Sequence, residues 1–190
     1  WYIFLVCAIT LQSVAWAVIA LLRNLLTARG EAPITSLAFQ IAVIAIGLPI
    51  FLVHWLWAQR LAGRELDERE AALRRFYLYG ALAGFLGPFL ANAFDLVARL
   101  LWLPFGERPG DFEFLAFSPA ESIVRALIAI AVLALLWFYH GRVVAADATA
   151  APERGSAATM RRLYVLGFSA VGVTMTTLAL IHLLRWIMFQ

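Results

Sequence analysis

The sequence predicts an all-α fold, an integral membrane helical bundle of about five transmembrane helices arranged as tandem parallel helix-pair repeats. Three observations predict it. Hydrophobic residues fill 64% of the 190 positions and charged residues only 14%, against about 45–50% and about 25% in soluble domains. Apolar residues gather in five long runs, and a short motif recurs along the chain. We therefore treat residues 1–190 as a single transmembrane domain.

Each of the five apolar runs is long enough to cross a membrane, which takes about 20 mostly apolar helical residues. The runs extend from Trp1 to about Leu26, from Thr35 to Ala58, from Phe76 to Leu103, from Pro119 to His140, and from Leu163 to Phe189. They are continuous and do not alternate with polar residues, which disfavours strands. Pro49 and Pro88 fall inside two of the runs and are expected to kink them.

Helix-start signals precede two of the runs. Ser118-Pro119-Ala120-Glu121 has the form of a capping box with proline at the first helical position. Asp67 lies three residues before Glu70 and also resembles a helix start. The third helix is therefore expected to begin in water at this acidic turn before it enters lipid.

Arginine is unevenly distributed among the connections. Residues 59–75 carry five Arg and residues 141–162 carry four, whereas 27–34 and 104–118 carry one each. By the positive-inside rule, connectors 59–75 and 141–162 are cytoplasmic and the bundle lies in the bacterial inner (cytoplasmic) membrane. The net charge of +3 is therefore explained by arginines that set the orientation of the helices in the membrane. We expect no nucleic acid as a partner.

The most specific signal is an internal repeat. Arg74-Arg75-Phe76-Tyr77 recurs as Arg161-Arg162-Leu163-Tyr164, and the chain opens with Trp1-Tyr2. Each tyrosine begins an outward helix that ends near an arginine, and the returning helix ends in His54 in the first unit and His140 in the second. The arginines are Arg23, Arg99 and Arg185. The units cover approximately residues 1–60 and 74–142, with a half unit at 160–190.

Because two helices make one unit, successive units keep the same orientation, unlike the inverted repeats of many transporters. The repeat predicts an Arg-Arg pair ahead of Trp1 and a returning helix after Gln190 in the full gene product.

Together these motifs resemble an uncharacterised family of bacterial multi-spanning membrane proteins, a domain of unknown function with tandem Arg-Arg-x-Tyr and His helix-pair repeats. The resemblance also rests on Gly47-Leu48-Pro49 and on His54-Trp55 ahead of a basic connector. It covers most of the chain. The chain departs from the pattern at residues 104–118, and its second unit lacks the matching proline and tryptophan. The resemblance implies the fold and no activity.

His54 and His140 are the candidate cofactor ligands because they occupy equivalent positions in the two units. Two imidazoles at similar depth can ligate one haem or a pigment metal across a bundle. We favour the alternative that each packs at a helix interface, so no cofactor is predicted. No metal site is predicted either, since Cys7 is the only cysteine.

Asp95 lies in the interior of an apolar run, away from the capping turn that holds Glu121, and Arg99 follows it by one helical turn. Acidic residues within a membrane are functional candidates by default. Asp95 lies 18 residues after Tyr77, roughly 27 Å along a helix, which places it near the outer boundary. An ion pair between Asp95 and Arg99 is therefore the preferred interpretation, and proton or ion handling is the alternative.

The remaining candidates are contact residues. Arg74, Arg75, Arg161 and Arg162 stand at helix starts, where a cation opposes the helix dipole. They are therefore expected to set the membrane orientation or to bind anionic lipid, in preference to binding a specific partner. The segment 104–118 is too short to span and holds Phe112, Phe114 and Phe117 among acidic residues, which makes it the candidate surface for protein contact.

The sequence contains no P-loop, dinucleotide, zinc-protease or nucleophile-elbow motif. We therefore expect a non-enzymatic protein, an accessory or scaffold subunit of a larger membrane complex, in contact with membrane lipids and other membrane-protein subunits. Two alternatives stay open. One is a membrane binder of haem, quinone, pigment or lipid, and the other is a small transporter or ion pathway.

Overall fold

The computed structural model describes the chain apart from residues 28–32, 103–118, 152–153 and 189–190, and it is all-helical in the described part. The helices are α1 (Tyr2–Thr27), α2 (Ile34–Arg64), α3 (Leu66–Glu70), α4 (Ala72–Trp102), α5 (Pro119–Ala150) and α6 (Ser156–Met188). Five of them, all but α3, are long and apolar enough to cross a membrane.

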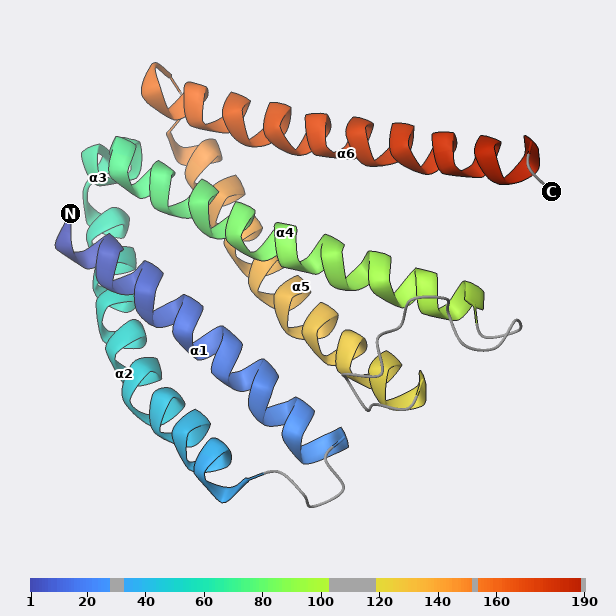
Figure 1. Ribbon diagram of the computed structural model, residues 1–190. Helices are drawn as coiled ribbons and strands as arrows, with labels where there is room; N and C mark the ends of the chain where they lie inside the picture. Colours follow the sequence, from blue (N-terminus) through green and yellow to red (C-terminus); the bar gives the residue numbers. More distant parts are fainter. Residues whose placement is uncertain (28–32, 103–118, 152–153, 189–190) are drawn as a thin grey trace.

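The long helices form two antiparallel pairs and one further helix (Figure 1). α1 packs along α2, and α4 packs along α5. α1 also contacts α4 and α5, which joins the two pairs, whereas α6 packs mainly against α4. We call the end where α2 leads into α4 and α5 leads into α6 the connector end. The opposite end, where α1 ends and α5 begins, is the loop end.

Two helices continue beyond their predicted ends. α2 runs to Arg64 and not to Ala58, and α5 runs to Ala150, ten residues past His140. The extension of α5 is rich in alanine, the residue with the highest helix propensity. The helix therefore continues after its apolar run has ended.

The prediction that the third membrane helix begins at Asp67 is wrong. Asp67 belongs to the separate short helix α3, which is flanked by the extended residues Glu65 (ψ 120°) and Ala71 (ψ 123°). Two extended residues interrupt the i→i−4 hydrogen-bond ladder, so the chain turns twice between α2 and α4. The proposed capping residue Ser118 lies outside the described residues, although α5 does begin at Pro119.

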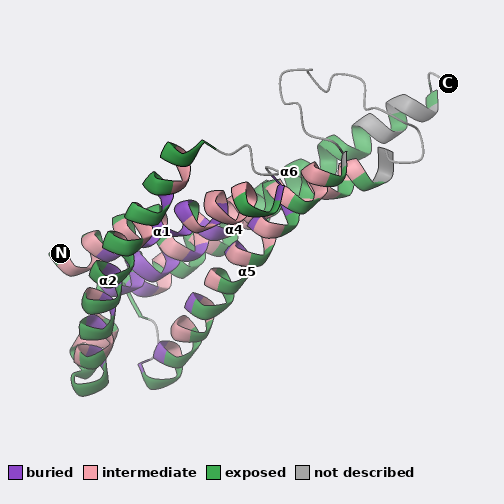
Figure 2. Ribbon diagram, turned by 90° about the horizontal axis from the view of Figure 1, so that it is seen from below, coloured by how far each residue is buried: buried purple, intermediate pink, exposed green. Residues whose placement is uncertain are grey.

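The core lies where α1, α2, α4 and α5 meet (Figure 2). Its buried residues are Cys7, Leu11, Ala15, Ile19, Phe51, Trp55, Ala58, Tyr77, Leu78, Phe85, Ala129 and Leu133. The described part of α6 is different, because none of its most apolar stretch is buried within the chain. A helix that is apolar all round and uncovered by protein requires an apolar surrounding.

Gly47 allows the closest approach between α1 and α2. A Cβ atom at this position would lie 2.8 Å from Cγ2 of Val14, and a β-branched valine in a helix is held in one rotamer. We expect Gly47→Ala to lower the free energy of unfolding by about 1–3 kcal/mol through overpacking. Unfolding by SDS from lipid bicelles measures this change.

Gly63→Ala provides the matched control, because no atom lies within 4 Å of a Cβ atom placed there. This control is expected to be neutral or slightly stabilising, since alanine favours the helix. Adding Val14→Ala to Gly47→Ala should recover most of the loss. Equal effects of the two glycine substitutions would contradict the close approach at Gly47.

Candidate functional site

A buried ion pair crosses the bundle at the connector end. Nε of Arg74, on α4, donates to Oδ2 of Asp147, on α5, over 2.7 Å, and the two side chains are only 1% and 7% exposed. Nη2 of Arg74 also donates to Oε1 of Gln59, on α2, over 2.9 Å. Three helices are thus joined through one guanidinium group.

Arg75 is buried beside this pair. Its Nη2 donates to the backbone carbonyl of Ala151 over 3.1 Å, and the residue is 1% exposed. The expectation that Arg74 and Arg75 face lipid headgroups is therefore wrong, because the extension of α5 covers both. Asp147 was overlooked for the same reason, since a helix predicted to end at His140 places Asp147 in a solvated connector.

An aromatic cluster lies directly against Arg74. The guanidinium carbon of Arg74 is 5.9 Å from the ring centroid of Trp55, close enough for a cation–π contact. The Trp55 ring also contacts Tyr77, His140 and Tyr139, with centroids 5.5, 5.7 and 6.3 Å away. Nε1 of Trp55 donates to the hydroxyl of Tyr139 over 2.6 Å. The cluster therefore joins α2, α4 and α5.

His140 is fully buried in this cluster and has one ring nitrogen engaged. Its Nδ1 lies 2.8 Å from the carbonyl oxygen of Leu136. A carbonyl oxygen only accepts, so Nδ1 carries the proton and Nε2 is the nitrogen that remains for another group. Nε2 of His140 and the hydroxyl of Tyr77 are buried side-chain atoms that have no hydrogen-bond partner among the described residues. Their rings are in edge contact, with centroids 6.2 Å apart.

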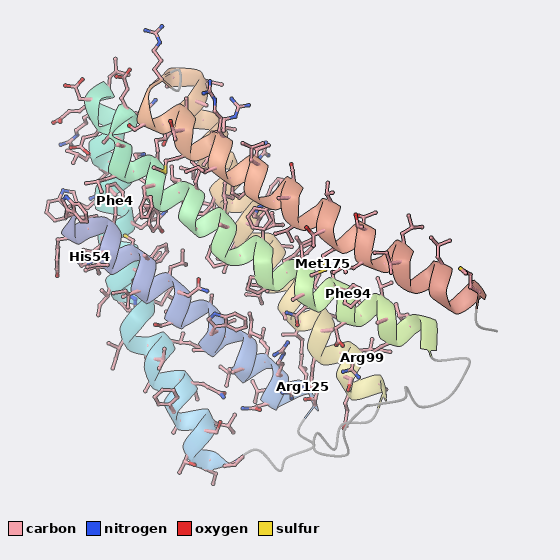
Figure 3. The ribbon with its side chains drawn as sticks, turned by 45° about the horizontal axis from the view of Figure 1, so that its top comes forward. Phe4, His54, Phe94, Arg99, Arg125 and Met175 are labelled. Carbon is pink, nitrogen blue, oxygen red and sulfur yellow. The ribbon has the colours of Figure 1, made fainter. Side chains whose placement is uncertain are left out.

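His54 lies in a different environment. Its ring is half-buried at the connector end and contacts Tyr2 edge-on at 5.7 Å, and its Nδ1 is 2.8 Å from the carbonyl oxygen of Ile50 (Figure 3). His54 packs on the outer side of α1, whereas His140 packs on core aromatic rings. The two imidazoles thus contact separate sets of residues. They are not arranged as the pair of ligands to one haem or pigment metal that the sequence offered. Among the described residues, no group of three or more His, Cys, Asp and Glu side chains is placed to hold a metal ion.

A second polar network ties the helices together at the loop end. Arg23, on α1, donates from Nη2 to Oδ1 of Asn92, on α4, over 3.1 Å. Nε of Arg23 donates to the backbone carbonyl of Arg125, on α5, over 3.0 Å, and Arg125 donates to Oγ1 of Thr27 over 3.0 Å. The sequence indicated Arg23 through the repeat, but nothing in its pattern identified Arg125 as the partner.

Asp95 and Arg99 form an ion pair at the same end of the molecule (Figure 3). Nε of Arg99 donates to Oδ2 of Asp95 over 2.8 Å, and the side chains are 31% exposed for Arg99 and 43% for Asp95. This geometry follows from their one-turn spacing. The pair is local to α4, and neither residue joins the network that Arg23 makes.

The other predicted contact residues are placed as follows. Arg161 and Arg162 are exposed in the first turns of α6. Phe112, Phe114 and Phe117 lie outside the described residues, and so do the side chains of His182 and Arg185 on α6.

Five apolar helices of spanning length, uncovered on their outer faces and joined by polar contacts in their interior, define a multi-pass helical membrane protein. Residues 1–124 match the family model described as Domain of unknown function (DUF5671). The chain belongs to this family. No curated protein and no solved structure matches it.

Proposed function

We propose that the protein is a non-enzymatic accessory or scaffold subunit of a larger complex in the bacterial inner membrane, with connectors 59–75 and 141–162 in the cytoplasm. One observation carries this proposal: polar side chains, buried at the connector end and half-buried at the loop end, hold helices to one another at both ends of the bundle. Arg74 bonds to α2 and α5 at the connector end, and Arg23 bonds to α4 and α5 at the loop end.

Such contacts suit a scaffold better than a transport pathway. A buried ion pair contributes little net stability, because desolvation offsets the attraction, but it can fix which helices pair and in which register. A transporter needs a polar site that changes its partners between two states. The Asp95–Arg99 pair lies within one helix and would not link moving parts.

The test is purification of the tagged full-length protein from native membranes in mild detergent. We expect other membrane-protein subunits to elute with it in fixed stoichiometry. Replacing Phe112, Phe114 and Phe117 with serine should lower the affinity of a partner about 30-fold, the fold-change of a 2 kcal/mol interface hot spot. Phe39→Ser, at an exposed position on α2, is the control. Elution of the protein alone from native lipid discs would contradict the proposal.

A second candidate function is the binding of a small polar or lipid-soluble molecule. The observation that favours it is the pair formed by Nε2 of His140 and the hydroxyl of Tyr77, both buried and without a partner in the part of the chain that the structure describes. Buried polar groups of this kind are ordinarily bonded, so a ligand that accepts from Tyr77 and donates to His140 would complete the site.

Tyr77→Phe tests the second candidate, because it removes only the hydroxyl group. Extraction and mass spectrometry of the purified protein should then show loss of the bound molecule, with the thermal midpoint retained. Tyr2→Phe is the control, because Tyr2 is exposed. An absorbance spectrum would show a Soret band if the ligand were haem, and His140→Ala should remove that band. Identical extracts from both variants would exclude the site.

A further inference from the structure

Corresponding ring pairs occur at both boundaries between repeat units. Phe4 of α1 contacts Tyr77 of α4 with centroids 5.6 Å apart, and Tyr79 of α4 contacts Tyr164 of α6 at 5.7 Å. Tyr79 lies 75 residues after Phe4, which is also the separation of Tyr77 from Tyr2. α6 therefore packs on α4 through the same positions by which α4 packs on α1.

A second ring pair recurs within each unit. Tyr2 and His54 meet edge-on with centroids 5.7 Å apart and an interplanar angle of 64°, and Tyr77 and His140 meet at 6.2 Å and 61°. In both units the imidazole Nδ1 is 2.8 Å from the carbonyl oxygen one turn earlier. Tyr164 is the third tyrosine of this series, and its hydroxyl accepts a hydrogen bond from Nε1 of Trp137 over 3.1 Å.

An open apolar groove adjoins this tyrosine. It has a volume of about 560 Å³ and is formed by α4 and α5. Its lining residues are Leu86, Phe89, Ala134, Leu135, Trp137 and Phe138. We call it the α4/α5 groove. Trp137 belongs to the groove and also bonds to Tyr164, so one side chain links the groove to the tyrosine of α6.

The first unit shows what covers the corresponding surface. The repeat spacing matches Leu86 with Leu11, Phe89 with Val14, and Trp137 with Phe51. These three first-unit residues are buried, whereas the equivalents of Ala134, Leu135 and Phe138, which are Leu48, Pro49 and Leu52, are exposed. Leu11 and Phe51 share a buried cluster with Ala129 and Leu133 of α5, and α5 packs against α1. On the first unit, therefore, the returning helix of the next unit covers the part of this surface around Leu11 and Phe51, whose equivalents in the groove are Leu86 and Trp137.

A second apolar pocket, of about 400 Å³, lies between α4 and α6. It differs from the α4/α5 groove in the exposure of the equivalent residues in the first two units. Two of its lining residues, Gly80 and Leu163, correspond to Leu5 and Phe76 at the boundary between the first two units. Leu5 and Phe76 are 58% and 60% exposed. These two positions of the first two units are thus not covered by a helix, whereas Tyr164, which also lines this pocket, corresponds to the buried Tyr77.

We propose that the α4/α5 groove is the seat of one further transmembrane helix, the returning helix of the third repeat unit, supplied by the segment that follows α6 in the same polypeptide. This helix packs on α4 and α6 as α5 packs on α1 and α4. It carries a histidine near its connector end, whose ring meets Tyr164 edge-on. His54 lies 52 residues after Tyr2 and His140 lies 63 residues after Tyr77, so the third histidine is expected at a similar distance beyond Tyr164.

The experiment uses the full gene product in its native membrane. A photoreactive benzoylphenylalanine replaces Leu86 in the groove, the equivalent of the covered Leu11, and in a separate variant it replaces Phe39, which is 70% exposed on α2. After illumination, mass spectrometry identifies the attached peptides. The probe at Leu86 is expected to form an intramolecular cross-link to an apolar peptide beyond Gln190, and the probe at Phe39 should label lipid.

Three outcomes would overturn the proposal. They are a cross-link from Leu86 to a second copy, a cross-link to a different protein, or labelling of lipid alone. A gene product in which no apolar segment with a histidine follows Tyr164 at the stated spacing would overturn it as well. None of these results bears on the buried polar contacts that support the scaffold role, so the two proposals fail separately.

Discussion

Asp147→Ala is expected to lower the free energy of unfolding by about 3–5 kcal/mol, the cost of leaving one member of a buried ion pair without its partner. Arg74 would keep its bond to Gln59 but lose the carboxylate that neutralises it, in a position that is 1% exposed. Equilibrium unfolding in lipid bicelles measures the change. In this variant α4 and α5 should both unfold at a lower denaturant concentration, because the ion pair joins these two helices.

Asp95→Ala is the matched control, since Asp95 also pairs with an arginine at 2.8 Å but is far more exposed. Exposed pairs are worth about 1 kcal/mol or less. A double replacement of Arg74 by Met and Asp147 by Leu should recover most of the stability, because an apolar pair of similar volume avoids the unpaired charge. Equal losses for Asp147→Ala and Asp95→Ala would contradict the buried position of the first pair.

Trp55→Ala is expected to have the second large effect, a loss of about 3–5 kcal/mol, as for other buried aromatic residues replaced by alanine. Trp55 is 2% exposed. Its ring contacts Phe51, Tyr77 and His140, and it is the donor to the Tyr139 hydroxyl. Replacing Trp55 with alanine leaves a cavity and leaves the Tyr139 hydroxyl without its hydrogen-bond donor.

Trp57→Ala provides the comparison two residues further along the same helix, because Trp57 is 56% exposed. It should change the unfolding free energy by less than about 0.5 kcal/mol, as surface substitutions do. Near-ultraviolet circular dichroism is a second measurement. The signal of the clustered aromatic rings should fall in Trp55→Ala and persist in Trp57→Ala. The reverse order would show that the aromatic cluster has been assigned to the wrong tryptophan.

The helices were predictable from the sequence because lipid imposes a simple rule. Each crossing needs about 20 apolar residues and must satisfy its own backbone hydrogen bonds. All five apolar runs are helices, and Pro49 and Pro88 lie inside two of them. The ends were harder to predict, because hydropathy marks where lipid ends and not where the helix ends. The alanine-rich extension of α5 past His140 shows the difference.

The candidate site was less predictable, because burial of a charge depends on tertiary contacts. In the sequence, Arg74 and Arg75 resemble surface cations at a helix start. In the fold, the carboxylate of Asp147 bonds to Arg74 and the carbonyl of Ala151 bonds to Arg75. The equivalence of His54 and His140 was readable from the repeat, but their different burial was not. His140, in the second unit, has Trp55 of the first unit packed against it, whereas His54 contacts Tyr2 of its own unit.

The central claim is that the apolar helices cross the membrane, and cysteine accessibility tests it most directly. Cys7→Ala removes the one native thiol, and single cysteines then replace Ile34 and Asp67, which are exposed beyond opposite ends of the apolar run of α2. A membrane-impermeant maleimide added to intact cells should label Ile34→Cys at once and Asp67→Cys only after the membrane is opened. Labelling of both positions from the same side would contradict the account.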